Sequence, residues 1–168
     1  GSGDAWDLHS KRGGVALLTP FDQGMGTDLY QGFGDALFAK RYYLDNQRAK
    51  YCLLLASDMV YRDDYNRLLE HHLETEADIT ILYSRDIRLK DGDPTHLANL
   101  TIEDGLVTGT NFGSHAGDGC FNLGASIMSK ELLVELLEDA CSQGRYDFVA
   151  DVLGASLSRC KVAPLEHT

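Results

Sequence analysis

The chain has 168 residues, 43% of them hydrophobic and 24% charged, a balance typical of a folded domain with a buried apolar core. Its formal net charge of −11 argues against nucleic acid and against an anionic membrane as partners, because phosphate groups bind clustered lysine and arginine. No apolar run approaches the roughly 20 residues that span a bilayer, and no secretory signal opens the sequence.

Short apolar runs alternate with amphipathic segments along the first half of the chain. Residues 15–18 predict a buried strand, and residues 35–44 predict a helix with apolar side chains near one side. The run 51–56 is continuous and apolar, as expected of a central strand covered on both faces. Asp63 or Asp64 is expected to cap the next helix, whose apolar positions follow a 3.6-residue period.

The second half continues this alternation. An Asp-Gly pair predicts a hairpin turn, a Ser129 cap opens a helix, and Gly144 ends it. The predicted elements are strands, a hairpin and helices over residues 79–83, 99–107, 121–128, 129–143, 147–157 and 161–164. Strands separated by helices indicate an open α/β sheet with mostly parallel pairing. Ligands of such sheets bind at the carboxyl ends of the strands.

Asp58 is a candidate by position, because it directly follows the most apolar strand. A carboxylate there could hold Mg²⁺ against substrate phosphates, or could only cap a turn. The glycine-rich stretch 23–34 could bring backbone close to a ligand or form a flexible loop, and it matches neither a P-loop nor a Rossmann fingerprint. The four cysteines form no CxxC pair, which favours reduced thiols in a cytoplasmic protein. The histidines show no metal-ligand spacing, and His71 and His72 are expected on the solvated edge of a helix.

Several segments carry a more specific pattern. A Trp-Asp-Leu triplet precedes GGVALLTP, and the stretches YQGFGDA and YCLLLASDMVYRDDY follow at the expected distances. An Asn-Leu-Gly triplet and the stretch YDFVAD come near the end of the chain. These segments occupy residues 6–8, 13–20, 30–36, 51–65, 122–124 and 146–151. In this order, over nearly the whole chain, they resemble the bacterial ADP-glucose pyrophosphorylase family.

The resemblance implies a Rossmann-like nucleotidyltransferase fold with a mostly parallel mixed sheet. It implies that residues 1–168 are the central and C-terminal part of one domain, with the triphosphate loop and the β-helix domain outside this chain. Such an incomplete sheet is expected to expose an apolar edge and to self-associate. The family joins ATP and glucose 1-phosphate into ADP-glucose with Mg²⁺. Asp58 matches a metal ligand of the family, and the implied substrate-binding positions are Tyr30, Gly32, Asp35, Asn122 and Gly124.

The departures from the family pattern concern its chemistry. The segment 109–114 lacks the lysine that grips the sugar phosphate in the family, and Phe33 replaces a threonine. Asn122 replaces the sugar-site serine, and Ser57 replaces a glycine. We therefore assign no catalytic residue and expect a regulatory-type, catalytically impaired subunit that pairs with a catalytic subunit. Its expected ligand is a small phosphorylated sugar or a nucleotide sugar. The alternatives are an active subunit and a nucleotide-sugar sensing module.

Overall fold

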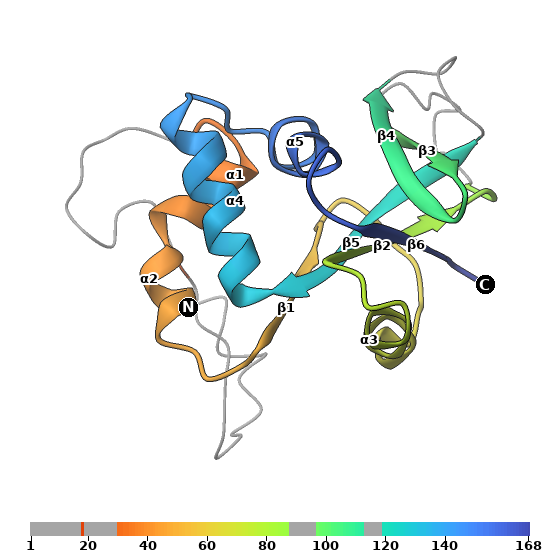
Figure 1. Ribbon diagram of the computed structural model, residues 1–168. Helices are drawn as coiled ribbons and strands as arrows, with labels where there is room; N and C mark the ends of the chain where they lie inside the picture. The colour runs from red at the N-terminus through yellow and green to blue at the C-terminus, as the bar shows by residue number, and fades with distance from the viewer. Residues whose placement is uncertain (1–17, 19–29, 88–96, 113–118) are drawn as a thin grey trace.

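The computed structural model describes residues 18, 30–87, 97–112 and 119–168. An open six-stranded sheet lies at the centre, with helices against both of its faces (Figure 1). The elements in chain order are α1 (Phe33–Ala39), α2 (Arg41–Asp45), β1 (Tyr51–Leu55), α3 (Tyr65–Glu74), β2 (Ile79–Ser84), β3 (Ala98–Glu103), β4 (Leu106–Phe112), β5 (Cys120–Ser129), α4 (Lys130–Ser142), η3 (Phe148–Leu153), α5 (Gly154–Ser156) and β6 (Val162–Glu166). Apart from Leu18, the expected strand 15–18 lies outside the described residues, as do residues 23–29 of the glycine-rich stretch.

The α/β class and the mixed open sheet are confirmed. The strand order is β4-β3-β5-β2-β6, and β1 pairs with β5 on the same side as β3. Only the β2–β6 pair is parallel among the described strands, so the expectation of mostly parallel pairing is wrong. The reason is the place of β5, which lies between β1 and β2 and runs antiparallel to both. The strands β1 and β2 therefore keep a common direction without being neighbours.

Alternating side chains of the central strands build two apolar clusters. In β2, Ile79 and Ile81 point into a cluster formed with α1, α4 and η3, which we call the α4-side cluster. Leu82 points to the other face and joins Leu68 of α3 in the α3-side cluster. All six residues of β2 are buried, as expected of a strand covered on both faces.

The predicted helix ends and the hairpin turn are confirmed. Asp64 accepts the backbone N–H of Asn66 at 3.0 Å and caps α3, and Ser129 caps α4 by accepting from Leu132 at 3.1 Å. Gly144 follows α4 with a φ of +71°. The β3–β4 turn, Asp104 and Gly105, has φ values of +50° and +76°. Two positive values favour the Asp-Gly sequence found there.

Two predicted helices differ from the structure in their form. Residues 35–44 form two helices that meet at Lys40, where φ is −108° and ψ is 13°. This break lets both α1 and α2 contact α4, so tertiary packing overrides local helix propensity. Residues 147–157 begin as a π-helix, in which the N–H of Val152 donates to the carbonyl of Asp147, and continue as the short helix α5.

His72 is buried, which corrects its expected place on a solvated helix edge. Its side chain is 4% exposed because α3 turns this residue toward the sheet. Its Nδ1 lies 2.9 Å from Oγ1 of Thr80 in β2, and the ring of Tyr51 packs edge-on against it. The pair of polar groups satisfies both side chains inside the core.

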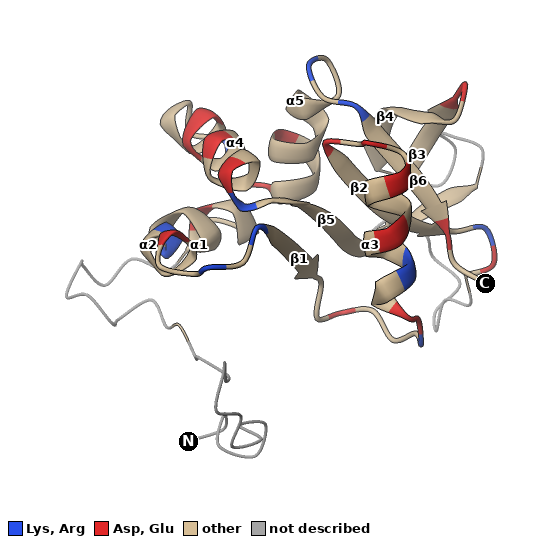
Figure 2. Cartoon of the chain, turned by 60° about the horizontal axis from the view of Figure 1, so that its bottom comes forward, with Lys and Arg blue, Asp and Glu red and all other residues tan. Residues whose placement is uncertain are grey.

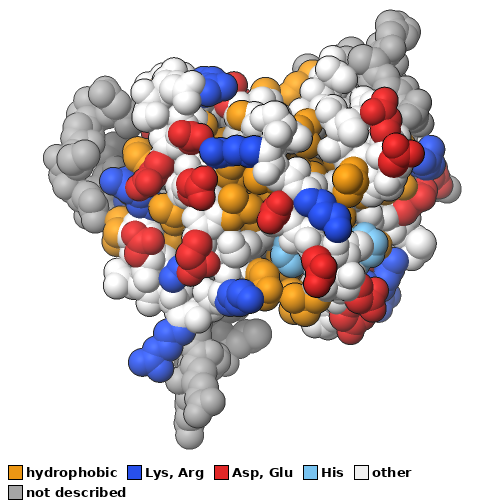
Figure 3. Space-filling view, viewed as in Figure 1, with side chains coloured by type: hydrophobic (Ala, Val, Ile, Leu, Met, Phe, Trp, Pro, Cys, Tyr) orange, Lys and Arg blue, Asp and Glu red, His pale blue; other side chains and the backbone are white. Residues whose placement is uncertain are grey.

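The surface in Figure 3 shows lysine and arginine side chains scattered among acidic ones, without a broad basic patch on that face. None of the helices in the described ranges is long and apolar enough to cross a membrane.

Candidate functional site

The loop after β1 carries the predicted metal ligand. β1 ends at Leu55, and the chain then runs without regular structure to the start of α3 at Tyr65. Asp58 is exposed early in this loop and borders a hollow of about 750 Å³ that also reaches the ends of β2 and β6. Asp86 and His167 line the same hollow. The carboxylate of Asp58 is therefore open to a ligand from solvent.

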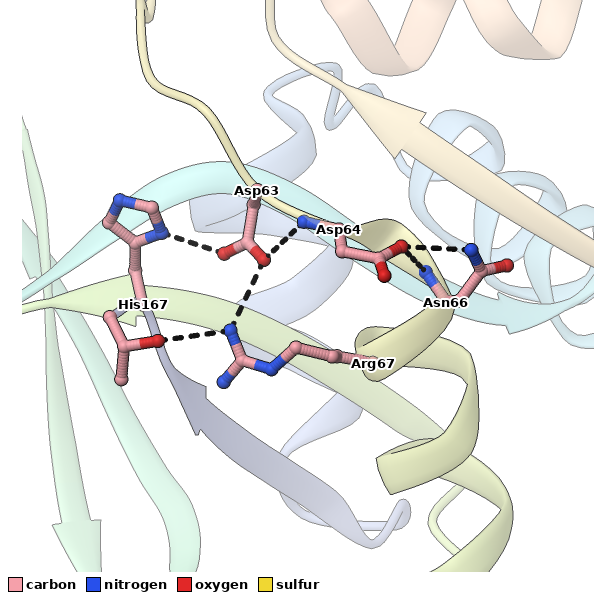
Figure 4. A network of polar contacts seen from close by, with 6 residues as sticks. Asp63, Asp64, Asn66, Arg67 and His167 are labelled. Atoms are coloured by element: carbon pink, nitrogen blue, oxygen red, sulfur yellow. Dashed lines mark hydrogen bonds and ion pairs between the residues drawn. The ribbon is translucent and has the colours of Figure 1, made fainter.

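A buried carboxylate fixes the far end of this loop. Oδ2 of Asp63 lies 2.7 Å from Nδ1 of His167, and Oδ1 accepts the backbone N–H of Asp64 at 2.7 Å (Figure 4). Arg67 approaches the same carboxylate at 3.4 Å and donates to Oγ1 of Thr168 at 3.1 Å. The Asp63 side chain is only 3% exposed, so these contacts replace the water it loses. The network ties the end of β6 to the loop that carries Asp58.

Tyr61 of the loop and Tyr83 of β2 also contact this network. The ring of Tyr61 packs edge-on against His167 at 5.5 Å, and the backbone N–H of His167 donates to the carbonyl of Tyr83 at 2.8 Å. Burial raises the pKa of Tyr61 well above its ordinary value, and a hydrogen bond with Tyr65 adds to this effect. The Tyr61 hydroxyl at the hollow therefore stays neutral and acts as a hydrogen-bonding group at any physiological pH.

A bulge in β5 brings two of the predicted substrate positions together. The register of β2 on β5 shifts so that Leu82 faces Ala125 while Tyr83 faces Asn122. Gly124 has a φ of +69°, and the side chain of Asn122 accepts its N–H at 2.8 Å. A Cβ on Gly124 would lie 2.4 Å from the Cβ of Ala56. Only glycine permits this close approach of β5 to the end of β1.

Of the other three predicted substrate positions, Gly32 and Asp35 have structural contacts. A Cβ on Gly32 would lie 2.5 Å from the carbonyl oxygen of Tyr146, so glycine is needed for backbone packing. The carboxylate of Asp35 accepts the backbone N–H of Gln31 at 2.9 Å. Tyr30 is partly buried, and its hydroxyl has no hydrogen-bond partner among the described residues.

A small apolar cavity lies where the resemblance places the sugar. Its volume is about 50 Å³, and its lining includes Asn122, Gly124, Phe33 and Phe148. Phe33 stands edge-on to Phe148, with ring centroids 5.5 Å apart. Leu123, between the two substrate positions, lines the larger hollow instead. The bulge of β5 therefore separates two hollows, and Asp58 belongs to the larger one.

Sequence comparisons find relatives of the first half of the chain. The Nucleotidyl transferase family matches residues 15–90. Glucose-1-phosphate adenylyltransferase, or ADP-glucose pyrophosphorylase, from Halalkalibacterium halodurans is 40% identical over 81 residues, which are 48% of this chain and 21% of that protein. The protein of the same name from Desulforamulus reducens is 41% identical over 81 residues, 48% of this chain and 20% of that protein. These matches support the resemblance to the ADP-glucose pyrophosphorylase family. The matched segment spans about a fifth of the length of these relatives.

The similarity in structure extends over more of the chain than the similarity in sequence. The crystal structure of HddC from Yersinia pseudotuberculosis superposes with a TM-score of 0.60 and 20% sequence identity. The superposition covers 83% of this chain and 55% of that protein. At this identity the likeness supports the open α/β fold of the described ranges, and it carries no functional argument.

The ADP-glucose pyrophosphorylase family gives the exposed carboxylate of Asp58 a chemical context. No group of three or more histidine, cysteine or acidic side chains within the described ranges could hold a metal ion. Mg²⁺ commonly binds through one or two carboxylates together with substrate phosphates. Asp58 could supply one such carboxylate. Asp86 lines the same hollow and is the candidate for a second.

The sequence did not reveal the residues of the site that contact partners far away in the chain. Asp63 and His167 are 104 residues apart, and no spacing or motif connects them. Asp63 stood out only as one of two possible helix caps, a role that the structure gives to Asp64. The sequence revealed one member of the Phe33–Phe148 pair, because Phe33 departs from the family pattern of the ADP-glucose pyrophosphorylases.

Proposed function

We propose that this chain is the central and C-terminal part of the nucleotidyltransferase domain of a regulatory-type glucose-1-phosphate adenylyltransferase subunit. In this proposal the subunit is catalytically impaired and acts in the cytoplasm, in glycogen biosynthesis. It assembles with a catalytic subunit of the same family and alters that subunit's conversion of ATP and glucose 1-phosphate to ADP-glucose and pyrophosphate. The observation that carries the proposal is the small size of the cavity at the expected sugar position.

The small volume of this cavity argues against productive sugar binding. Ligand pockets usually have volumes of about 300–1,000 Å³, far above the roughly 50 Å³ found between Phe33 and Gly124. Phe33 lies where the family has a threonine, and its ring stands edge-on to Phe148 in the wall of the cavity. A hexose would have to displace this aromatic pair, which is stabilised by about 0.5–1.5 kcal/mol beyond its burial.

The electrostatics of the same cavity also oppose phosphate binding. Its lining in the described part of the chain contains no charged side chain. The segment Gly109–Phe112 of β4, which the resemblance aligns with the start of the phosphate-gripping turn, contains no lysine. Burying a phosphate without a cation is costly, and a charge-assisted contact contributes about 1.5–3 kcal/mol. The described lining of this cavity therefore offers no cation to neutralise a phosphate, a contribution on which phosphoryl and nucleotidyl transfer depend.

The larger hollow favours a second candidate function, a nucleotide-sugar binding module without turnover. Its volume of about 750 Å³ is sufficient for such a ligand. Asp58 at its border would hold Mg²⁺, and the ion would neutralise charge on bound phosphates. Titration of ADP-glucose with Mg²⁺ by calorimetry would separate this function from pure assembly. Binding that Asp58→Asn weakens at least tenfold would favour the sensing module.

The decisive assay measures ADP-glucose formation from ATP, Mg²⁺ and glucose 1-phosphate. The protein that carries this chain is assayed alone and then mixed with a catalytic subunit of the family. We expect no turnover alone and a changed rate or effector response in the mixture. Turnover alone that disappears in Asp58→Asn would overturn the proposal in favour of an active subunit.

Phe33→Thr tests the role of the closed cavity directly. The variant should open the cavity and increase the affinity for glucose 1-phosphate severalfold. Phe112→Thr is a matched control, because Phe112 and Phe33 are similarly exposed, at 49% and 47%, and Phe112 does not line the cavity. Equal effects of the two variants, or none from Phe33→Thr, would show that the aromatic pair does not exclude the sugar.

A further inference from the structure

The loop between β1 and α3 is anchored at its two ends. Figure 2 shows it running from the end of β1 to the start of α3, with acidic residues along it. At its start, the N–H of Ala56 donates to the carbonyl of Gly124 at 2.8 Å. At its end, Asp63 lies in the buried network with His167. Between these anchors, no backbone hydrogen bond joins residues 57–62 to another described part of the chain. The position of this segment therefore depends on side chains.

The side chains within the segment give it only apolar support. Met59 and Tyr61 are partly buried and pack against the α3-side cluster. Asp58 is exposed, and Val60 is exposed completely, at 103%. Apolar contacts are not directional. Met59 and Tyr61 therefore limit how far the segment moves, but they do not fix the orientation of the Asp58 carboxylate.

His167 is held by strands on its side of the contact with the loop. Its backbone N–H donates to the carbonyl of Tyr83 at 2.8 Å, and the neighbouring Glu166 accepts from the Tyr83 hydroxyl at 3.0 Å. Tyr83 belongs to β2, which is buried along its whole length and pairs with β6. Buried core strands are the parts of a fold that open least often. The imidazole of His167 is therefore a fixed point to which the loop is attached.

The contact between Asp63 and His167 is short, buried and directional. Oδ2 of Asp63 lies 2.7 Å from Nδ1 of His167, and the Asp63 side chain is 3% exposed. An ionised carboxylate only accepts hydrogen bonds, so Nδ1 carries the hydrogen. Buried charged contacts add little net stability over an apolar pair of similar volume, but they require a narrow range of distances and angles. The contact is therefore suited to fixing the loop in one position.

We propose that Asp63 and His167 are positioning residues, whose contact fixes the loop that carries Asp58 relative to β2 and β6. With the contact formed, the loop is ordered and the Asp58 carboxylate keeps one orientation toward the larger hollow. With the contact broken, residues 57–62 keep only their apolar contacts and become mobile. A change that moves His167 at the end of β6 therefore reaches Asp58. The order of the loop follows from these contacts, whereas its benefit to a ligand rests on the Mg²⁺ role of Asp58 in the second candidate function.

Electron paramagnetic resonance of a nitroxide label measures the order of the loop in the protein that carries this chain. The label is attached to Val60→Cys, since the Val60 side chain is fully exposed. We expect His167→Gln to sharpen the spectrum, as a mobile segment does, because the amide nitrogen of glutamine is one bond farther from the backbone than Nδ1. A label on Leu73→Cys, at a 51% exposed position of α3, should be unaffected. The unmodified protein, labelled in parallel, gives the signal of its own cysteines.

His167→Asn is the matched variant. The amide nitrogen of asparagine is as many bonds from the backbone as Nδ1 of histidine, and it can donate to the Asp63 carboxylate. This variant should therefore keep the ordered spectrum, although it removes the same ring as His167→Gln. Loss of order in both variants would assign the loop's position to packing of the ring against Tyr61, whose centroid lies 5.5 Å away, and would overturn the proposal. An unchanged spectrum in His167→Gln would overturn it as well.

Binding of Mn²⁺, used in place of Mg²⁺, tests whether the ordered loop serves Asp58. Asp58→Asn should weaken this binding at least tenfold, His167→Gln should weaken it severalfold, and His167→Asn should leave it within about twofold of the unmodified protein. A mobile loop with unchanged Mn²⁺ affinity would show that the contact does not position Asp58. Absence of any Mn²⁺ binding that depends on Asp58 would instead remove the metal role from the second candidate function. The spin-label spectra would then still decide whether the contact orders the loop.

Discussion

Gly124 is the residue on which the candidate site depends most directly. Its φ of +69° disfavours any side chain, and a Cβ there would lie 2.4 Å from the Cβ of Ala56. Gly124→Ala should therefore lower the free energy of unfolding by about 2–4 kcal/mol, from backbone strain and overpacking together. Urea unfolding measures this loss. Gly144→Ala is the control, because Gly144 has a φ of +71° with nothing within 4 Å of the added carbon, and should cost about 1 kcal/mol. Equal losses would mean that the contact with Ala56 is not tight.

His72 makes stability depend on pH. Burial lowers the pKa of His72 below its ordinary value of 6.5 in the folded state; the nearby carboxylate of Asp78 opposes this shift in part, and His71 adds to it. The unfolded chain then binds more protons than the folded chain as pH falls below about 6.5. Stability should be fully present above that pH and decrease as pH falls through it toward the folded pKa, with a slope of at most about 1.4 kcal/mol per pH unit from this residue. Unfolding measured between neutral and mildly acidic pH should show this loss, and His72→Gln should remove that part of the slope. An unchanged slope in His72→Gln would assign the pH dependence to other groups.

At the scale of the elements, local chemistry was sufficient to predict the helix ends and the hairpin turn. Ser129, Asp64 and the Asp104-Gly105 pair act through groups within three residues of themselves, so their residue types predict their geometry. Strand pairing and helix packing were harder to predict from the sequence, because they join distant segments. The place of β5 between β1 and β2, and the break at Lys40, follow from tertiary contacts that no periodicity encodes.

In the candidate site too, local features were predicted from the sequence and long-range contacts were not. The position of Asp58 at the carboxyl end of a strand followed from its sequence neighbours, and the structure leaves it exposed there. Asn122 and Gly124 were expected near the sugar, and both line the small cavity. Sequence could not show that Phe33 meets Phe148 across that cavity, or that Asp63 meets His167, because each contact joins segments more than 100 residues apart.

At the scale of the whole molecule, β2 and β5 hold the fold together. Both strands send alternate side chains into the α4-side and α3-side clusters, so neither cluster has a sheet of its own. Leu82 and Ile81, adjacent in β2, belong to different clusters. Loss of packing on one face should therefore disorder the strands that support the other face.

This shared sheet predicts a single cooperative unfolding transition. Phe148→Trp would report from the α4-side cluster and Tyr65→Trp from the α3-side cluster, each in a Trp6→Phe background that removes the native tryptophan. Both probes should give the same denaturation midpoint. Leu137→Ala removes a fully buried side chain from the α4-side cluster and should cost about 2–5 kcal/mol. Because β2 and β5 carry both clusters, the loss should lower the midpoint of both probes equally. A midpoint that falls only for the Phe148→Trp probe would show that the two faces unfold independently.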